Sequence, residues 1–239
     1  MVPEKKDYYW GVSHDPNYQF TMGRENGLSF SDYKQINKAY CSNICRTPLG
    51  CQHNGYEDPN NCDRCKCPEG FAGTTCESLA PTGYNCGGVL EATEDKRLVD
   101  GSNIAGKKCS WLIQARPGCA VELVVEKIYF TAQHVCQTGY LEVNLGETNF
   151  DTTGYGLCIE VTEPTEIQQS NANKVLIMSR SSMRNDYFRV KYSSSTCVEY
   201  DDPPRRGTCD NGAVTDQRPT VSDKCKSLLE CLRRYCPLT

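Results

Sequence analysis

The chain contains 17 cysteines in 239 residues, and their distribution constrains its fold more than any other feature. None lies in residues 1–40, seven lie in 41–76, six are widely spaced over 86–197, and four lie in 209–236. This density is typical of small modules that are crosslinked by disulfides in an oxidising compartment. We therefore expect a secreted, extracellular protein. Because the number is odd, at least one thiol lacks a partner within the chain.

Hydropathy and charge argue against several kinds of partner. No segment approaches the roughly 18–20 consecutive apolar residues of a membrane span, so none is expected. The net charge is −4, and the longest basic clusters are the pairs Arg205–Arg206 and Arg233–Arg234. Neither nucleic acid nor an anionic membrane is therefore an expected partner. The start of the chain lacks the apolar stretch of a signal peptide, which favours a missing segment upstream.

One helix is predicted before the first cysteine, over residues 31–40. Ser29 or Ser31 can accept hydrogen bonds from the free amides at its start. Four of its residues share one face at helical spacing: Tyr33, Ile36, Asn37 and Tyr40. A single helix cannot bury enough surface to hold a fold, so this face needs a partner. We interpret the segment as the end of a larger domain.

Six cysteines follow between positions 45 and 76, in a segment too short to form a substantial hydrophobic core. Disulfides must therefore supply the stability, at about 2–4 kcal/mol each. Six cysteines allow 15 pairings, and their spacing alone does not choose among them. The polar, turn-rich stretches 79–83 and 201–207 are expected linkers on either side of the next region.

Residues 86–195 carry the pattern of a mainly β domain. Predicted strands cover 110–115, 120–127, 140–145, 174–179 and 187–192. In the second of these, Val121, Leu123 and Val125 alternate with neighbours that include two glutamates, as a half-buried strand requires. A region of this length with such strands fits a β-sandwich.

The first segment resembles a known family. Residues 18–32 (YQFTMGRENGLSFSD) and 36–41 (INKAYC) are similar to the last segment of an astacin-type zinc metalloendopeptidase domain. The resemblance implies that residues 1–42 are the carboxyl-terminal remnant of such a domain. It also implies that Cys41 is an external half-bridge, whose mate lies early in the catalytic domain. We expect Met22, within this match, to pack and not to form a methionine turn.

The second segment resembles an EGF-like module, assigned to residues 43–77. The motif is Cys65-Lys66-Cys67 followed by PxGFxGxxC ending at Cys76. The resemblance implies three disulfides: Cys45 to Cys62, Cys51 to Cys65 and Cys67 to Cys76. Calcium is not expected here, because residues 38–41 (KAYC) stand where the calcium-binding subtype carries acidic and amide residues.

The third segment resembles a CUB domain, assigned to residues 84–197. The match includes CGGVL from Cys86, CSWLI from Cys109, CQTGYLEV from Cys136, YGLC ending at Cys158, and YFRVKY at 187–192. It implies disulfides Cys86 to Cys109 and Cys136 to Cys158. Since Cys119 begins one predicted strand and Cys197 follows the last, we pair these two as an additional clasp.

The remaining residues, 198–239, are predicted to be a linker and a cysteine-rich helical tail. A helix beginning at Ser222 would place four residues on one side: Cys225, Leu228, Leu229 and Leu232. The pairing of the four tail cysteines is left open. The whole chain is thus expected to be mainly β and disulfide-rich, with short terminal helices.

No catalytic, cofactor-binding or metal-binding residue is predicted. The astacin motif HExxHxxGxxH places three histidines and a glutamate around zinc. This chain has only His14, His53 and His134, far apart, and none is followed by glutamate. We interpret all three as ordinary loop residues. Zinc is therefore expected in the full-length family and not in this chain.

The calcium site found in many CUB domains also lacks its acids. The three corresponding positions hold Thr131, Gly139 and approximately Ser181, whereas a calcium ion needs several oxygen ligands. Calcium-dependent binding is thus not expected. Residues 131–135 and 181–186 are candidates for an exposed partner surface, with ordinary solvated loops as the alternative.

Two hypotheses for function follow. In the first, the chain is the non-catalytic, carboxyl-terminal part of a secreted astacin-like zinc metalloendopeptidase, whose EGF-like and CUB modules recognise extracellular or matrix proteins. In the second, it is a stand-alone EGF-CUB binding protein without enzymatic activity, in which Cys41 could form an intermolecular bridge. An independent enzyme of another class has no supporting motif. The sequence leaves the oligomeric state open.

Overall fold

The computed structural model describes residues 11–22, 27–82, 86–102, 104–131, 136–146, 150–167, 170, 172–181, 183–195 and 197. The chain divides into two units, Met1–Glu199 and Tyr200–Thr239, and every described residue belongs to the first. The predicted tail helix and its four cysteines therefore lie outside the described residues. No helix in the described part is long and apolar enough to cross a membrane.

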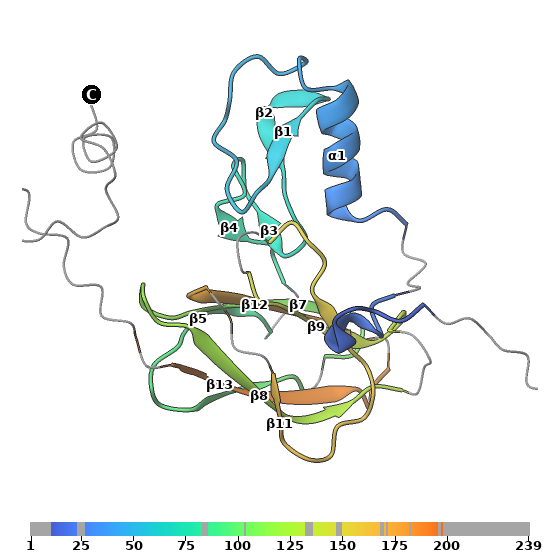
Figure 1. Ribbon diagram of the computed structural model, residues 1–239, viewed down its shortest axis with the longest axis vertical. Helices are drawn as coiled ribbons and strands as arrows, with labels where there is room; N and C mark the ends of the chain where they lie inside the picture. Colours follow the sequence, from blue (N-terminus) through green and yellow to red (C-terminus); the bar gives the residue numbers. More distant parts are fainter. Residues whose placement is uncertain are drawn as a thin grey trace, which may run out of the picture. The chain divides into compact units, whose positions relative to one another are not determined.

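The amino-terminal part contains a short 3-10 helix, η1 (Pro16–Tyr18), and one α-helix, α1 (Phe30–Tyr40) (Figure 1). Ser29 is the N-cap of α1: its Oγ accepts from the Asp32 amide at 3.2 Å. In return, the Asp32 carboxylate accepts from the Ser29 amide at 2.8 Å, which completes a capping box. The predicted helix is present one residue earlier than expected, and of the two candidate caps Ser29 holds the position.

The segment from Cys45 to Cys76 forms small antiparallel pairs. Strand β1 (Tyr56–Asp58) pairs with β2 (Asn61–Lys66), and β3 (Phe71–Ala72) pairs with β4 (Ser78–Leu79). The three disulfides join Cys45 to Cys62, Cys51 to Cys65 and Cys67 to Cys76, the same pairs that the EGF-like resemblance implies. These bonds hold a segment whose buried apolar residues are few.

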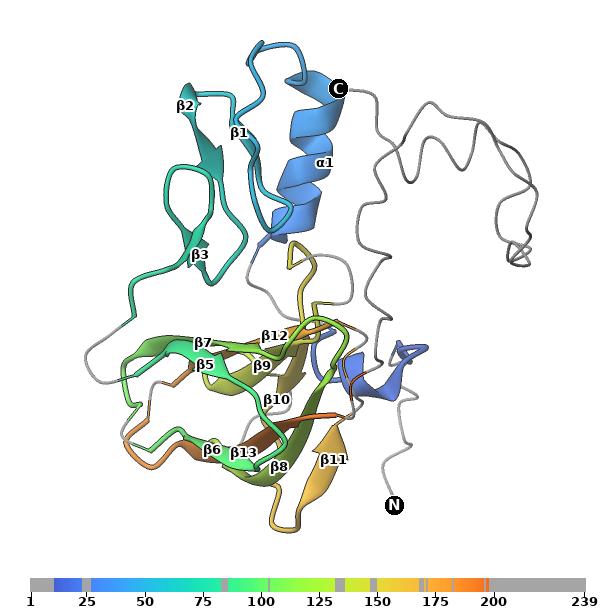
Figure 2. The ribbon, with the colours of Figure 1, turned by 90° about the vertical axis from the view of Figure 1, so that its left-hand side faces the viewer.

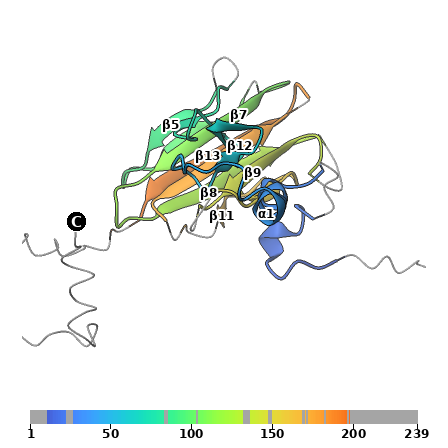
Figure 3. The ribbon, with the colours of Figure 1, turned by 90° about the horizontal axis from the view of Figure 1, so that it is seen from above.

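The remaining strands form two packed sheets (Figure 2). The five-stranded sheet has the order β10-β9-β12-β7-β5, most of which Figure 3 shows side by side. Its strands are β5 (Gly88–Glu91), β7 (Lys108–Gln114), β9 (Tyr140–Asn144), β10 (Tyr155–Leu157) and β12 (Lys174–Arg180). The four-stranded sheet has the order β11-β8-β13-β6. Its strands are β6 (Arg97–Asp100), β8 (Val121–Tyr129), β11 (Thr165–Ile167) and β13 (Tyr187–Ser194).

The alternating pattern of the sequence builds the core between these sheets. In β8, Val121, Leu123 and Val125 are each at most 2% exposed, as the period of two predicted. Trp111 of one sheet meets Phe188 of the other edge to face, with ring centroids 5.5 Å apart. Pairs within the sheets are antiparallel except β5 with β7, which are parallel. The predicted mainly β fold with a sandwich is confirmed.

Three further disulfides belong to the sandwich: Cys86 to Cys109, Cys136 to Cys158 and Cys119 to Cys197. The last pair joins the residue two before β8 to the residue three after β13, the two cysteines that the sequence pairs as an additional clasp. Among the described cysteines, Cys41 alone is free.

Candidate recognition surfaces

One end of the sandwich is organised around a single buried carboxylate, that of Asp186, which is 2% exposed. Its Oδ1 accepts hydrogen bonds from the Thr131 amide at 2.9 Å and the Thr131 hydroxyl at 3.1 Å. Its Oδ2 accepts from the Ser181 hydroxyl at 2.8 Å and the Met183 amide at 3.4 Å. Both oxygens are thus occupied by donors from two loops, which they tie together.

The hydrogen bonds to Asp186 explain why part of the expected partner surface is buried. Thr131 and, approximately, Ser181 are the positions that the CUB resemblance assigns to calcium-binding acids, and here both donate to Asp186. The expectation that residues 181–186 form an exposed surface is wrong for Ser181 and Asp186, which are buried, and right for Met183, Arg184 and Asn185. Of the other candidate loop, Thr131 is exposed, and 132–135 lie outside the described residues.

The second candidate surface is the outward face of α1, in which no residue is buried. Tyr33, Ile36 and Tyr40 are 53%, 47% and 83% exposed. The start of the helix is held to the rest of the unit, because the ring centroid of Phe30 lies 5.4 Å from that of Tyr56. The expected unpartnered apolar face is therefore present in the structure, although Asn37, assigned to the same face, is half-buried.

Cys41 lies at the carboxyl-terminal end of this helix. It is the C-cap residue, and its amide donates to the Asn37 carbonyl at 2.8 Å. The thiol is free and half-buried. Burial raises the pKa of the nearby Tyr56, and the charges of Asp58 and Cys41 raise it further. The structure thus leaves the thiol without a disulfide partner among the described residues.

A third feature is the contact between the Cys45–Cys76 segment and the five-stranded sheet. The His53 ring stacks on Phe71 at 3.8 Å and 15°, and meets the edge of Phe150 at 5.6 Å. Buried Leu112, Leu176 and Met178 complete this cluster from the sheet. Burial lowers the pKa of His53, and the nearby Lys174 lowers it further. The position predicted to be an ordinary loop residue is therefore part of an aromatic contact.

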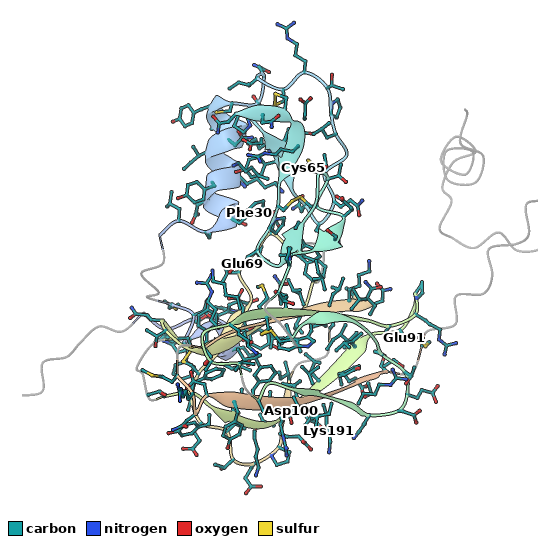
Figure 4. All side chains as sticks on the ribbon, turned by 180° about the vertical axis from the view of Figure 1, so that it is seen from behind. Phe30, Cys65, Glu69, Glu91, Asp100 and Lys191 are labelled. Carbon is teal, nitrogen blue, oxygen red and sulfur yellow. A yellow bond between two sulfur atoms is a disulfide. The ribbon has the colours of Figure 1, made fainter. Side chains whose placement is uncertain are left out.

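Polar contacts surround this cluster, and most converge on Asp151. Its carboxylate accepts from Lys34 Nζ at 2.9 Å and from the Asn54 amide nitrogen at 2.6 Å, while its carbonyl accepts from the Ser31 hydroxyl at 2.8 Å. A separate ion pair joins Arg180 of β12 to Glu69, which Figure 4 labels. Sequence reasoning missed Asp151, because no local pattern marks an acid that contacts residues about 100 positions away.

The two histidines that the structure describes, His14 and His53, belong to no metal-binding group. His14 is exposed, His53 is stacked as described above, and His134 lies outside the described residues. Where the structure is described, no group of three or more His, Cys, Asp or Glu side chains could hold a metal ion. Met22 is 42% exposed, and its neighbour Thr21 accepts a hydrogen bond from the Gly156 amide at 2.8 Å.

Comparison with known proteins identifies relatives. The model of the CUB domain family matches residues 86–192. Zinc metalloproteinase dpy-31 of Caenorhabditis elegans is 37% identical over 180 residues, covering 72% of this chain and 30% of that protein. Zinc metalloproteinase nas-37 of the same organism is 38% identical over 167 residues, covering 70% of this chain and 21% of that protein.

Among solved structures, the CUB1-EGF-CUB2 domain of human MASP-1/3 is similar at 18% identity and a TM-score of 0.37, covering 62% of this chain and 55% of that chain. The chain spans less than a third of the length of the two curated relatives above. The curated relatives that match the chain are astacin-family zinc metalloproteinases, and the chain carries a CUB domain at residues 86–192.

Proposed function

We propose that the chain is the non-catalytic, carboxyl-terminal portion of a secreted astacin-like zinc metalloendopeptidase. In this proposal, the EGF-like module at 43–77 and the CUB domain at 84–197 recognise extracellular or matrix proteins. Zinc and peptide hydrolysis belong to a catalytic domain upstream, of which residues 1–42 are the end. The matched share of the relatives, a minor part of each, supports this division.

The observation that carries the proposal is the exposed face of α1. Exposing Tyr33, Ile36 and Tyr40 on one helix leaves a contiguous apolar stripe in water, whereas monomeric proteins rarely expose large contiguous apolar patches. A preceding domain that packs on this stripe would bury it. The same domain would supply a cysteine for Cys41, which ends the same helix.

The chemical basis of recognition differs from hydrolysis. A peptidase of this family needs a metal, a bound water and a general base, and the motif for these is absent from the chain. The described surface instead offers exposed side chains held by a rigid sandwich, an arrangement that suits binding of a protein partner. Substrate or matrix binding by this part would position the catalytic domain.

The test is the mass and amino-terminal sequence of the native product, captured from its source with an antibody against the CUB domain. A product much heavier than 26.7 kDa, with HExxHxxGxxH upstream and a cysteine bonded to Cys41, is the expected result. A native product of about 26.7 kDa that begins near Met1 would contradict the proposal and leave a stand-alone binding module.

A further inference from the structure

The segment before Cys41 contacts the sandwich at the hairpin of β9 and β10. The first contact is at β10, the edge strand of the five-stranded sheet. The Gly156 amide of β10 donates to the Thr21 hydroxyl at 2.8 Å. Beside it, Tyr18 of η1 meets the buried Tyr155 edge to face, with ring centroids 5.8 Å apart (Figure 2). Because an edge strand presents unpaired backbone groups, the segment covers part of an edge that needs covering.

The second contact joins α1 to Asp151, in the loop between β9 and β10. The Asp151 carbonyl accepts from the Ser31 hydroxyl at 2.8 Å, and its carboxylate accepts from Lys34 Nζ at 2.9 Å. The side chains of Lys34 and Asp151 are 23% and 10% exposed, so water screens this ion pair less than a pair on the open surface. Lys34 also donates to the Asn54 carbonyl at 2.9 Å, which links the same helix to the Cys45–Cys76 segment.

The position of α1 depends on these contacts. The helix has 11 residues, none of which is buried, and an isolated helix of that length is only marginally stable in water. Tyr18, Thr21 and Ser31 lie within residues 18–32, which resemble the last segment of an astacin-type domain, and Lys34 follows directly. The residues that contact the hairpin therefore belong to the proposed end of the catalytic domain.

The contact between this segment and the hairpin is incomplete in the described residues. A cavity of about 420 Å³ remains between them, lined by Leu28 on one side and by Thr152 and Thr153 on the other. Leu28 is 53% exposed, and Phe20 and Met22 of the same segment are 36% and 42% exposed. Apolar side chains that are left in water around a contact favour a surface that a further part of the protein covers.

We propose that the β9–β10 hairpin is the surface on which the upstream catalytic domain docks, with Asp151 as its positioning residue. The inference rests on the proposed function and names the partner of this surface. Because the residues that already contact the hairpin are the end of that domain, the domain itself must lie next to the hairpin. A protein bound to the CUB domain is then held at a fixed distance from the active site, which favours cleavage more than a flexible tether does.

The first part of the test is hydrogen exchange of the full 239-residue chain, followed by mass spectrometry. Asp151→Ala with Thr21→Val removes the Lys34 ion pair and the bond to the Gly156 amide. The matched control is Asp95→Ala with Thr162→Val, the same substitutions at exposed positions elsewhere. Strand β12, in the middle of the sheet, is the internal reference for a folded sandwich.

We expect the amides of α1 to exchange about tenfold faster in the test variant and less than about twofold faster in the control, with β12 unchanged in both. The reason is that α1 opens locally once its contacts with the hairpin are lost. Unchanged exchange of α1 in the test variant would overturn the inference, because these contacts would then not hold the helix.

The second part compares the 239-residue chain with the native product, captured from its source as described above. Residues 150–156 should exchange at least about threefold more slowly in the native product, because the upstream domain covers the hairpin and suppresses its local opening. Strand β12 should exchange equally in both. Equal or faster exchange of residues 150–156 in the native product would overturn the inference, since the catalytic domain would then lie elsewhere.

The mass of the native product separates failure of this inference from failure of the proposed function. If the product is much heavier than 26.7 kDa and carries HExxHxxGxxH, but residues 150–156 are not slowed, the docking is wrong and the proposed function stands. If the product is about 26.7 kDa and begins near Met1, the proposed function is wrong, and the hairpin has no upstream domain to bind.

Discussion

At the scale of single residues, His53 makes the stability of the contact between the Cys45–Cys76 segment and the five-stranded sheet depend on pH. Its pKa is lowered in the folded protein, first by burial and then by Lys174, from a usual value of about 6.5. Other charges near this contact are Lys34 and Asp151, which pair with each other. Since the folded state favours neutral His53, its contribution to stability is complete above about pH 6.5 and is lost as the pH falls through the lowered pKa.

We therefore predict that His53→Phe, which keeps an aromatic ring and removes the titrating group, reduces the loss of stability between pH 7.5 and 5. The measurement is the thermal unfolding midpoint of the full chain at several pH values, compared with the unmodified protein. His14→Phe is the matched control at an exposed position and should leave the pH profile unchanged. An unchanged slope in His53→Phe would show that protonation of this ring does not destabilise the fold.

Asp58 is the most completely buried acid of the Cys45–Cys76 segment, with a side chain that is 0% exposed. Burial raises the pKa of Asp58, but hydrogen bonds from Asn60, Lys66 and Arg64 outweigh this and lower the pKa overall. The two cations lie 3.1 and 3.2 Å from its Oδ2. The carboxylate thus organises the turn between β1 and β2.

The prediction is that Asp58→Asn lowers the free energy of unfolding by about 1–3 kcal/mol, because the amide replaces a charged acceptor whose donors stay in place. Denaturant unfolding of the chain with its disulfides intact measures this. Asp63→Asn, at an exposed position of the neighbouring strand β2, should change the free energy by less than about 0.5 kcal/mol. Equal effects of the two substitutions would contradict a special role for Asp58.

At the scale of elements, α1 and the strands of the core were predictable because local chemistry determines them. Ser29 and Asp32 cap the helix through bonds that span three residues, and the sequence contains both partners. Strand β8 was predictable from its alternation, since the apolar residues of a half-buried strand must share one face. Both features depend only on residues that are close to one another in the sequence.

The stacked pair of Tyr129 and Tyr187 was less predictable, because it depends on register and on distant contacts. Tyr129 meets Tyr187 only because β13 pairs with β8 in a register that shifts between Arg189 and Val190. A register shift of this kind has no marker in this sequence, and without it different side chains would face each other. Asp186 could be read only as one acid in a polar loop until the structure showed its donors from residues 131 and 181.

The Cys119–Cys197 bond closes the longest loop among the described disulfides, with a sequence separation of 78. Its entropic effect on the unfolded chain should be about 1 kcal/mol larger than that of Cys86–Cys109, whose separation is 23. We predict that replacing Cys119 and Cys197 by serine lowers the free energy of unfolding more than replacing Cys86 and Cys109. Denaturant unfolding of the two double variants makes the comparison, and the reverse order would show that local packing outweighs loop closure.

At the scale of the whole molecule, the proposed function assigns zinc and peptide hydrolysis to a domain upstream of this chain. We predict that the purified 239-residue protein binds no stoichiometric zinc and cleaves no peptide substrate, because it contains no HExxHxxGxxH motif. Metal analysis after dialysis and a peptidase assay with added zinc measure the two properties. One tightly bound zinc per chain would contradict the assignment of the metal to an upstream domain.

The disulfide between Cys86 and Cys109 determines how the sandwich would respond to a stretching force. Cys86 precedes β5 and is bonded to Cys109 within β7. A stretching force that enters from the preceding module therefore passes through sulfur directly into β7, which is hydrogen-bonded to β12 along its whole length. Strand β5 and the residues up to Cys109 are relieved of tension. Reduction of this one bond would redirect the force through β5, so the mechanical strength of the junction depends on the redox state of its surroundings.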